Sequence, residues 1–306
     1  MTRPSQAGRE PVPLAALLLL LGIALAWGSG WPLMKYGVIE MPVFTFRWLT
    51  AILSGLCVLP LAAAMGQDVR LPRQEIGLAV VTGLFNVTGW FYFSGLALTM
   101  MAAGRSSVLA YTMPLWAFLA GLALGRERVT PRRVLGVACG LGAVALLAGS
   151  DLVRLGTAPL GVLAIMGAAI SWAIGTVIQK RTWRTPPMVL AGWQLIFGGI
   201  PLLVLSLLVD SDPFRDLTIL GVGAIAYTVL VGNVCGFVFW IRVVGLVPTA
   251  VASLGVLPVP MVGIMSGAIV LGEPVGWLEI GALALVTGAL TTVLPMPKLS
   301  MLKFWR

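Results

Sequence analysis

The sequence predicts an all-α membrane protein in which ten transmembrane helices form two inverted repeats of five, with both termini in the cytoplasm. Three observations support this: apolar runs about as long as a bilayer is thick, an uneven distribution of Lys and Arg, and residues that recur at a nearly constant offset. Of the 306 residues, 59% are hydrophobic and 10% are charged, whereas a typical soluble domain has about 25% charged residues. A water-soluble fold could not bury so much apolar surface.

The helices are predicted from apolar runs that are separated by charged, Pro-rich or Gly-rich breaks. A run of about 20 apolar residues spans the bilayer core as a helix, whereas a barrel strand needs only about 10. We expect helices at 14–35, 43–65, 76–98, 104–124, 134–150, 159–180, 188–209, 217–241, 248–271 and 277–295. The first run is too long for a signal peptide and matches a later segment, so we expect it to be retained.

The Lys and Arg residues predict the orientation of the bundle. With the N-terminus in the cytoplasm, 15 of the 20 basic residues fall on the cytoplasmic side. Four fall on the opposite side, and Arg47 lies within a span. Because cytoplasmic loops are enriched in Lys and Arg, this bias favours both termini inside and a multi-pass protein of the bacterial inner membrane.

An internal repetition divides the chain into two halves. Residues 25–37 (LAWGSGWPLMKYG) resemble residues 169–181 (AISWAIGTVIQKR), and 86–93 (NVTGWFYF) resemble 233–240 (NVCGFVFW). The matched pairs, at offsets of 145 to 147, include Trp27 and Trp172, Lys35 and Lys180, Asn86 and Asn233, Pro114 and Pro260, and Glu127 and Glu273. We therefore expect repeats at 1–153 and 154–306. Because five is odd, the second repeat enters the membrane from the opposite side, an arrangement typical of secondary transporters.

Several classes of function are disfavoured by what the sequence lacks. It has no histidine and no phosphate-binding loop motif, which argues against His-based catalysis, most zinc sites and ATP-driven work. Its three cysteines, Cys57, Cys139 and Cys235, lie inside apolar runs without metal-ligand spacing. The net charge of +9 comes from residues in the short breaks between the apolar runs, where it indicates the orientation of the chain in the membrane. We expect no metal, no cofactor, no enzymatic activity and no nucleic-acid partner, with membrane lipids as the surroundings.

Four motifs resemble the EamA family of the drug/metabolite transporter superfamily. They are W-G-S with a Lys eight residues after the Trp, Arg47 followed by Trp48, a Pro midway in the fourth and ninth helices, and L-G-x-E or L-G-E after them. The resemblance implies a ten-helix bundle with a cavity lined mainly by helices 1, 3, 4, 6, 8 and 9, and a small-molecule substrate. Family members export amino acids and other small metabolites, and the chain is similar in character to exporters of aromatic amino acids. In the second half Gly192 replaces the Arg.

Nine residues are candidates for binding the substrate: Trp27, Gly28, Trp31, Asn86, Trp90, Tyr111, Trp172, Asn233 and Ser253. Aromatic faces suit a planar apolar substrate, and indole N–H or phenol O–H groups can orient it. Ordinary helix packing is the alternative for the aromatic residues, close helix contact for the glycine, and ties between helices for the buried amides. We expect Pro32, Pro114 and Pro260 to break helices or act as hinges.

The charged residues are assigned mainly structural roles. Arg47 lies a few residues below the outer surface, where it could snorkel, guide a carboxylate outward or brace the second helix; bracing or snorkelling is favoured. Lys35 is expected at the outer rim, and Glu127 and Glu273 are expected to cap helix ends. Because no Asp or Glu lies near the middle of a span, we expect an uncoupled or weakly coupled exporter that works by alternating access. The alternative is a flippase for lipids or lipid-linked sugars.

Overall fold

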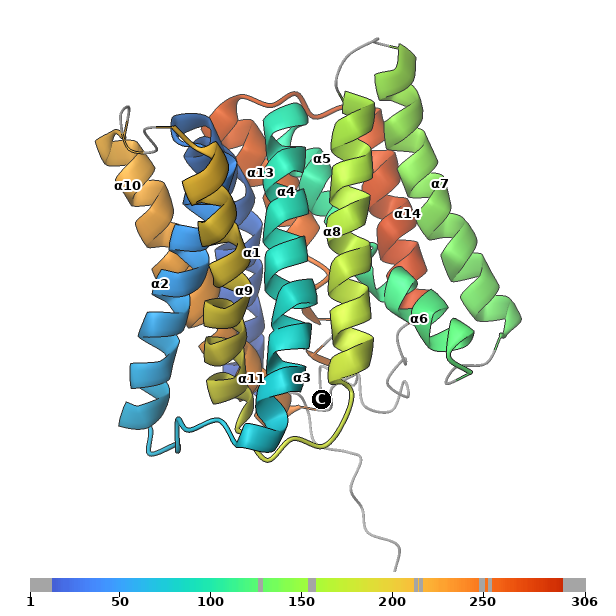
Figure 1. Cartoon of the computed structure of the whole chain (residues 1–306). Coiled ribbons are helices and arrows are strands. Elements are labelled where there is room, and N and C mark those ends of the chain that lie inside the picture. The colour runs from blue at the N-terminus through green and yellow to red at the C-terminus, as the bar shows by residue number, and fades with distance from the viewer. Residues whose placement is uncertain are drawn as a thin grey trace, which may run out of the picture.

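The computed structural model is a bundle of long helices that run side by side (Figure 1). It describes residues 13–125, 129–153, 158–211, 214, 217–247, 251–252 and 255–293. Within these residues there is no β-strand. Seven helical segments of the described part are long and apolar enough to cross a membrane, and two shorter apolar helices follow them.

The helices of the first half follow the predicted spans to within a few residues. They are α1 (Leu14–Glu40), α2 (Val43–Ala64), α3 (Arg73–Gly83), the π-helical segment η1 (Leu84–Gly89), α4 (Trp90–Met100), α5 (Ala103–Ala110), α6 (Met113–Ala123) and α7 (Pro131–Val153). The first and third spans extend beyond the apolar core that predicted them, because an α-helix can continue into the polar interface.

The second half repeats this order. Its elements are α8 (Ala158–Gln179), α9 (Pro187–Val209), α10 (Ile219–Ala226), η2 (Tyr227–Cys235), α11 (Gly236–Leu246), α13 (Val259–Leu271) and α14 (Trp277–Val293). The segments α3, η1 and α4 form one continuous helical rod, as do α10, η2 and α11. Both rods contain a π-helical stretch at matching positions of the repeat.

Two proline residues lie directly after helix interruptions. The fourth predicted helix is interrupted at Tyr111 and Thr112, between α5 and α6, and Pro114 lies in the first turn of α6. In the second half a turn at 256–258 precedes α13, and Pro260 lies in its first turn. Proline is tolerated there because the first helical residues need no N–H donor.

Pro32 differs from the expectation, because α1 runs without interruption from Leu14 to Glu40. Proline has no N–H to donate to the carbonyl four residues earlier, which here belongs to Gly28. The Ser266 hydroxyl of α13 donates to that Gly28 carbonyl at 3.4 Å. The same hydroxyl also lies 3.2 Å from the Gly263 carbonyl of its own helix, so the Gly28 carbonyl shares this donor. The helix continues through Pro32, and a hinge role for Pro32 stays a prediction.

The two halves make equivalent helix–helix contacts. The element α2 packs against its own counterpart α9, and α7 packs against its counterpart α14. The contact of α4 with α8 has as its equivalent the contact of α11 with α1, and the contact of α6 with α8 has as its equivalent that of α13 with α1. Exchanging the halves thus leaves this set of contacts unchanged.

The matched helices α1 and α8 run in opposite directions. Lys35, near the end of α1, bonds to the Met101 carbonyl at the end of the rod 73–100. Beyond the end of α8, the Arg184 N–H bonds to Glu75 at the beginning of that rod. We call these two ends of the bundle the Lys35 face and the Lys180 face.

Candidate functional site

Three tryptophans from three helices meet inside the bundle. Trp31 of α1 and Trp90 of α4 lie with ring centroids 6.2 Å apart at an interplanar angle of 78°. Trp90 and Trp172 of α8 lie 5.5 Å apart at 61°. These are edge-to-face arrangements, which are favoured because the positive edge of one ring meets the negative face of the other. We call these three residues the Trp cluster; it joins residues of both halves.

Trp27 lies outside the Trp cluster. Its ring is 6.2 Å from that of Trp240, and its indole N–H donates to the Gly232 carbonyl at 2.9 Å. Gly236 makes room for the indole, because a Cβ at that position would collide with its nitrogen. Trp27 therefore ties α1 to the second rod.

The bond from Trp27 has a counterpart in the other half. The Ser171 hydroxyl of α8 donates to the Phe85 carbonyl of η1 at 2.8 Å, and Phe85 matches Gly232 at an offset of 147. A π-helical turn shifts the backbone pairing, and polar backbone groups at membrane depth need partners. In each half, a donor from the other half meets the same carbonyl of the π segment.

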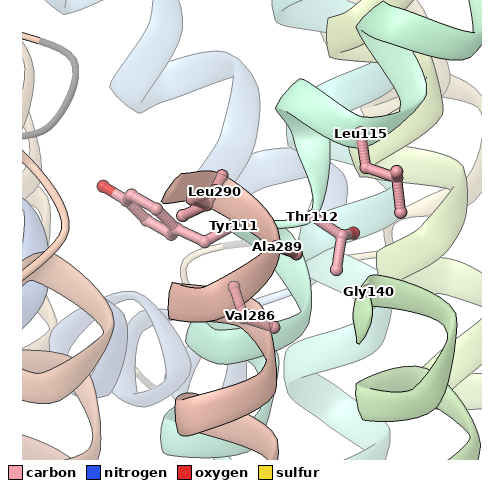
Figure 2. A pocket seen from close by; sticks show the side chains of 7 residues that line it. All are labelled: Tyr111, Thr112, Leu115, Gly140, Val286, Ala289 and Leu290. Atoms are coloured by element: carbon pink, nitrogen blue, oxygen red, sulfur yellow. The ribbon is translucent and has the colours of Figure 1, made fainter. Parts of the chain in front are cut away.

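Tyr111 lies at the interruption between α5 and α6, next to a very small cavity. The cavity measures about 10 Å³ and is lined by Tyr111, Thr112, Leu115, Gly140, Val286, Ala289 and Leu290. Figure 2 shows the ring of Tyr111 extending away from Leu115 and Gly140. A space of this size holds about one water molecule, so it is not a substrate site in this conformation.

The two glycines of α1 have different surroundings. A Cβ on Gly28 would lie 2.5 Å from Val262 and 2.9 Å from the Val259 carbonyl, so this residue allows close packing with α13. A Cβ on Gly30 would meet no atom within 4 Å, although the residue is buried. Of the two, Gly30 is the one beside open space, and it directly precedes Trp31 of the Trp cluster.

The two matched asparagines each bond to another helix. Asn86 donates to Gln179 Oε1 at 2.8 Å, and Gln194 of α9 donates to the same oxygen at 3.2 Å. Asn233 donates to the Ser54 hydroxyl of α2 at 2.9 Å. In this conformation both amides tie helices together. The sequence reasoning missed Gln194, although a lone amide within an apolar run was the signal that could have found it.

Ser253 and Glu127 lie outside the described residues. Glu273 caps a helix as expected: its two carboxylate oxygens accept the N–H groups of Ala103 and Gly104 at 2.6 and 2.9 Å, at the beginning of α5. The ammonium of Lys35 lies 3.1 Å from Glu273 Oε1. These contacts join α1, α5 and the connection after α13 at the Lys35 face.

A second ion pair reinforces the same face. Arg105 of α5 lies 2.7 Å from Glu279 of α14, and Glu279 also accepts the Gly276 N–H at 2.7 Å. The repeat places Val251 and Arg133 at the matching positions of the other half, and that combination cannot form an ion pair. The Arg105–Glu279 ion pair therefore has no equivalent between the matching positions of the other half.

The Lys180 face has a cleft of about 310 Å³ between α3, α6 and α8. Its walls are formed by Leu78, Leu124, Val177, Ile178, Lys180 and Arg181. Lys180 is exposed there, whereas the side chain of its counterpart Lys35 is only 21% exposed.

Arg47 does not snorkel to the surface, which corrects one of the roles favoured from the sequence. The residue is 1% exposed, because its side chain extends into the bundle between α1 and α4. The guanidinium lies 3.2 Å from Met34 Sδ and 3.2 Å from the Ser94 hydroxyl. Its central carbon lies 5.5 Å from the Phe91 ring centroid.

Comparison with known proteins gives matches along nearly the whole chain. The chain is 28% identical to the aromatic amino acid exporter YddG of Ancylobacter novellus, covering 95% of this chain and 98% of the relative. It is 26% identical to a probable amino-acid metabolite efflux pump of Escherichia coli, covering 89% and 92%. It is 23% identical to the uncharacterized transporter YoaV of Bacillus subtilis, covering 89% and 94%.

The fold is also known from a solved structure. A crystal structure that is 23% identical in sequence superimposes with a TM-score of 0.65, covering 90% of this chain and 95% of the other. The model of the EamA-like transporter family matches residues 14–149 and again residues 159–294. The chain is a multi-pass membrane protein that belongs to the EamA-like transporter family.

Proposed function

We propose that the protein exports amino acids, with a preference for aromatic ones, across the bacterial inner membrane. The observation that carries this proposal is the Trp cluster, which brings three aromatic rings from α1, α4 and α8 together between the two halves. Aromatic rings bind planar apolar groups well. The names of two relatives, an aromatic amino acid exporter and an amino-acid metabolite efflux pump, agree with this class of substrate.

The proposed topology has ten membrane crossings in two inverted repeats, 1–153 and 154–306, with both termini in the cytoplasm. The opposite directions of α1 and α8 support the inversion, as does the equivalence of contacts between the halves. The bias of Lys and Arg supports the orientation. In this topology the Lys35 face is the outer face and the Lys180 face is cytoplasmic.

Transport proceeds by alternating access, in which the two halves rock around a central site. The ion pairs Lys35–Glu273 and Arg105–Glu279 hold the outer face closed, while the cytoplasmic face has a cleft. The conformation is therefore assigned as outward-closed, the state that follows release to the outside.

Transport is expected to be uncoupled or weakly coupled to protons. Proton-coupled carriers use ionisable groups within the membrane. Among the described residues the buried acids are Glu75 and Glu279, and both lie in the first turn of a helix. Neither is placed to exchange a proton for substrate near the bundle centre.

Flux from proteoliposomes tests the proposal. Liposomes containing the protein are loaded with labelled L-tryptophan, and efflux is measured with and without an imposed pH gradient. We expect efflux down the tryptophan gradient, competition by tyrosine and phenylalanine, and reduced flux in Trp172→Ala. Transport of other amino acids but not aromatic ones would remove the aromatic preference, and strong dependence on the pH gradient would overturn the uncoupled mechanism.

A flippase is the second candidate. The cleft at the Lys180 face combines apolar walls with Lys180 and Arg181, a combination that also suits an acyl chain and an anionic headgroup. Inhibition of tryptophan efflux by anionic phospholipid, together with transbilayer movement of a fluorescent lipid, would favour this candidate over amino acid export.

A further inference from the structure

Arg47 lies on the membrane-spanning helix α2 and places a permanent positive charge in the interior of the bundle. Its guanidinium has five N–H donors, and the side chain is 1% exposed. In the part of the chain that the structure describes, no carboxylate lies within 4.0 Å of it. Among the described residues Nε has no hydrogen-bond partner. A buried charge is normally paired, so this guanidinium lacks an anion.

The acceptors around Arg47 are weak and neutral. Nη1 points to the Met34 sulfur at 3.2 Å and Nη2 to the Ser94 hydroxyl at 3.2 Å. A thioether is a poor acceptor on a flexible side chain that adopts other rotamers easily. The rings of Phe46 and Phe91 lie 5.7 and 5.5 Å from the guanidinium carbon and stabilise its charge only in part.

The fold makes room for the guanidinium. A Cβ on Gly95 would lie 3.0 Å from Arg47 Nε and 2.6 Å from Val43. The glycine therefore lets the guanidinium lie directly against α4. In the second half the residue that matches Arg47 is Gly192, so only the first half has this buried arginine.

The contacts of Arg47 lie on the same helix faces as the Trp cluster. Met34 follows Trp31 by three residues on α1, and Ser94 follows Trp90 by four residues on α4. Residues spaced three or four apart are neighbours on one face of a helix. The guanidinium thus lies about one helical turn from the two rings, on the side of the Lys35 face.

We propose that Arg47 binds the carboxylate of the transported amino acid while the substrate's aromatic ring packs on Trp31 and Trp90. The carboxylate takes the place of the Met34 sulfur, which swings away, and the planar guanidinium holds its two oxygens by paired hydrogen bonds. Ser94 remains as a neighbouring polar contact. This inference rests on the proposed function and deepens it, because it names the group that the site requires: a carboxylate about one helical turn from an aromatic ring.

Substrate analogues test this on the unaltered protein. Efflux of labelled tryptophan is measured in proteoliposomes against unlabelled tryptophan, tryptophanamide and tryptamine, the last two of which lack the carboxylate. We expect the amide and the amine to compete at least tenfold more weakly than tryptophan. Equal competition by tryptophanamide would overturn the proposal.

Two variants locate the effect at Arg47. Arg47→Gln is expected to raise the half-saturating concentration of tryptophan at least tenfold and to abolish the advantage of tryptophan over its amide. Arg133→Gln is the matched control, because Arg133 also lies over a Phe ring, at 5.1 Å from Phe118, but at the Lys180 end of α7. This variant should leave the half-saturating concentration of tryptophan and its advantage over the amide unchanged. Unaltered half-saturation in Arg47→Gln would refute the assignment. If that variant does not fold, Arg47→Lys and the analogue series on the unaltered protein still decide.

A binding experiment separates this inference from the proposed function. The thermal unfolding temperature of the purified full-length protein is measured with indole-3-acetate and with tryptamine. We expect stabilisation by the carboxylate alone, and none in Arg47→Gln. If no amino acid is transported but this difference is found, the exporter proposal fails and the Arg47 site stands; if neither ligand stabilises the protein, the Arg47 site fails.

Discussion

Glu273 holds Lys35 and the beginning of α5 at the same time. Its Oε1 lies 3.1 Å from the Lys35 ammonium and accepts the Ala103 N–H, while Oε2 accepts the Gly104 N–H. An acidic group is favourable at a helix N-terminus because it meets unpaired N–H groups and the positive end of the helix dipole. One carboxylate thus fastens α1 to α5 at the Lys35 face.

Removing this charge is predicted to open the Lys35 face. In Glu273→Gln the hydrogen bonds to a charged acceptor, worth about 1.5 kcal/mol or more, are weakened, so the outward-open population should rise roughly tenfold. A Ser107→Cys probe in a background without Cys57, Cys139 and Cys235 should then react faster with an impermeant thiol reagent added outside. Asp68→Asn, which removes an exposed acid at the opposite face, is the control; equal labelling rates in both variants would contradict the closure.

A single methyl group on Gly267 is predicted to have the same effect. A Cβ there would lie 2.6 Å from Glu273 Oε2, so Gly267→Ala should push the carboxylate off α5. We expect faster labelling of the Ser107→Cys probe from outside with little loss of folded protein. Gly245→Ala, whose Cβ would meet no atom within 4 Å, should label at the original rate. Slow labelling in Gly267→Ala would show that Glu273 can move without opening the face.

The two glycines of α1 are predicted to respond differently to alanine. Gly28→Ala forces a Cβ against Val262 and the Val259 carbonyl, and such overpacking costs about 1–3 kcal/mol. Gly30→Ala meets open space and should be neutral or slightly stabilising, because alanine is the better helix former. Thermal unfolding of both variants in detergent measures the difference. A lower unfolding temperature for Gly30→Ala than for Gly28→Ala would contradict the packing described here.

The centre of the Trp cluster is predicted to matter most for transport. Trp90 contacts both Trp31 and Trp172, and an aromatic pair contributes about 0.5–1.5 kcal/mol beyond its buried area. Trp90→Ala should therefore raise the half-saturating concentration of tryptophan about tenfold. Trp240→Ala removes a ring that packs on Trp27 outside the cluster, and it serves as the control. A larger effect in Trp240→Ala would move the substrate site toward the second rod.

Much of the fold could be predicted because few backbone structures are stable within a lipid bilayer. Backbone groups must be satisfied within each span, so apolar runs of the right length become helices, and the observed bounds lie close to the predicted ones. The matched prolines Pro114 and Pro260 also indicated where the two interruptions recur, whereas the π-helical segments were not predicted from the sequence. The sequence also predicted that Glu273 caps a helix end, and the structure shows that the capped end is the beginning of α5.

The candidate site could not be predicted to the same degree, because it depends on which faces of the helices meet. The sequence by itself determined that the chain is an all-helical membrane protein of two matched halves, since hydrophobicity and periodicity are local properties. Only the tertiary structure decided that Trp31, Trp90 and Trp172 gather while Trp27 turns to Gly232. It also decided that α1 continues without interruption through Pro32. A helix rotated by a third of a turn keeps its length and hydropathy but presents different side chains to its neighbours, and packing alone selects that rotation.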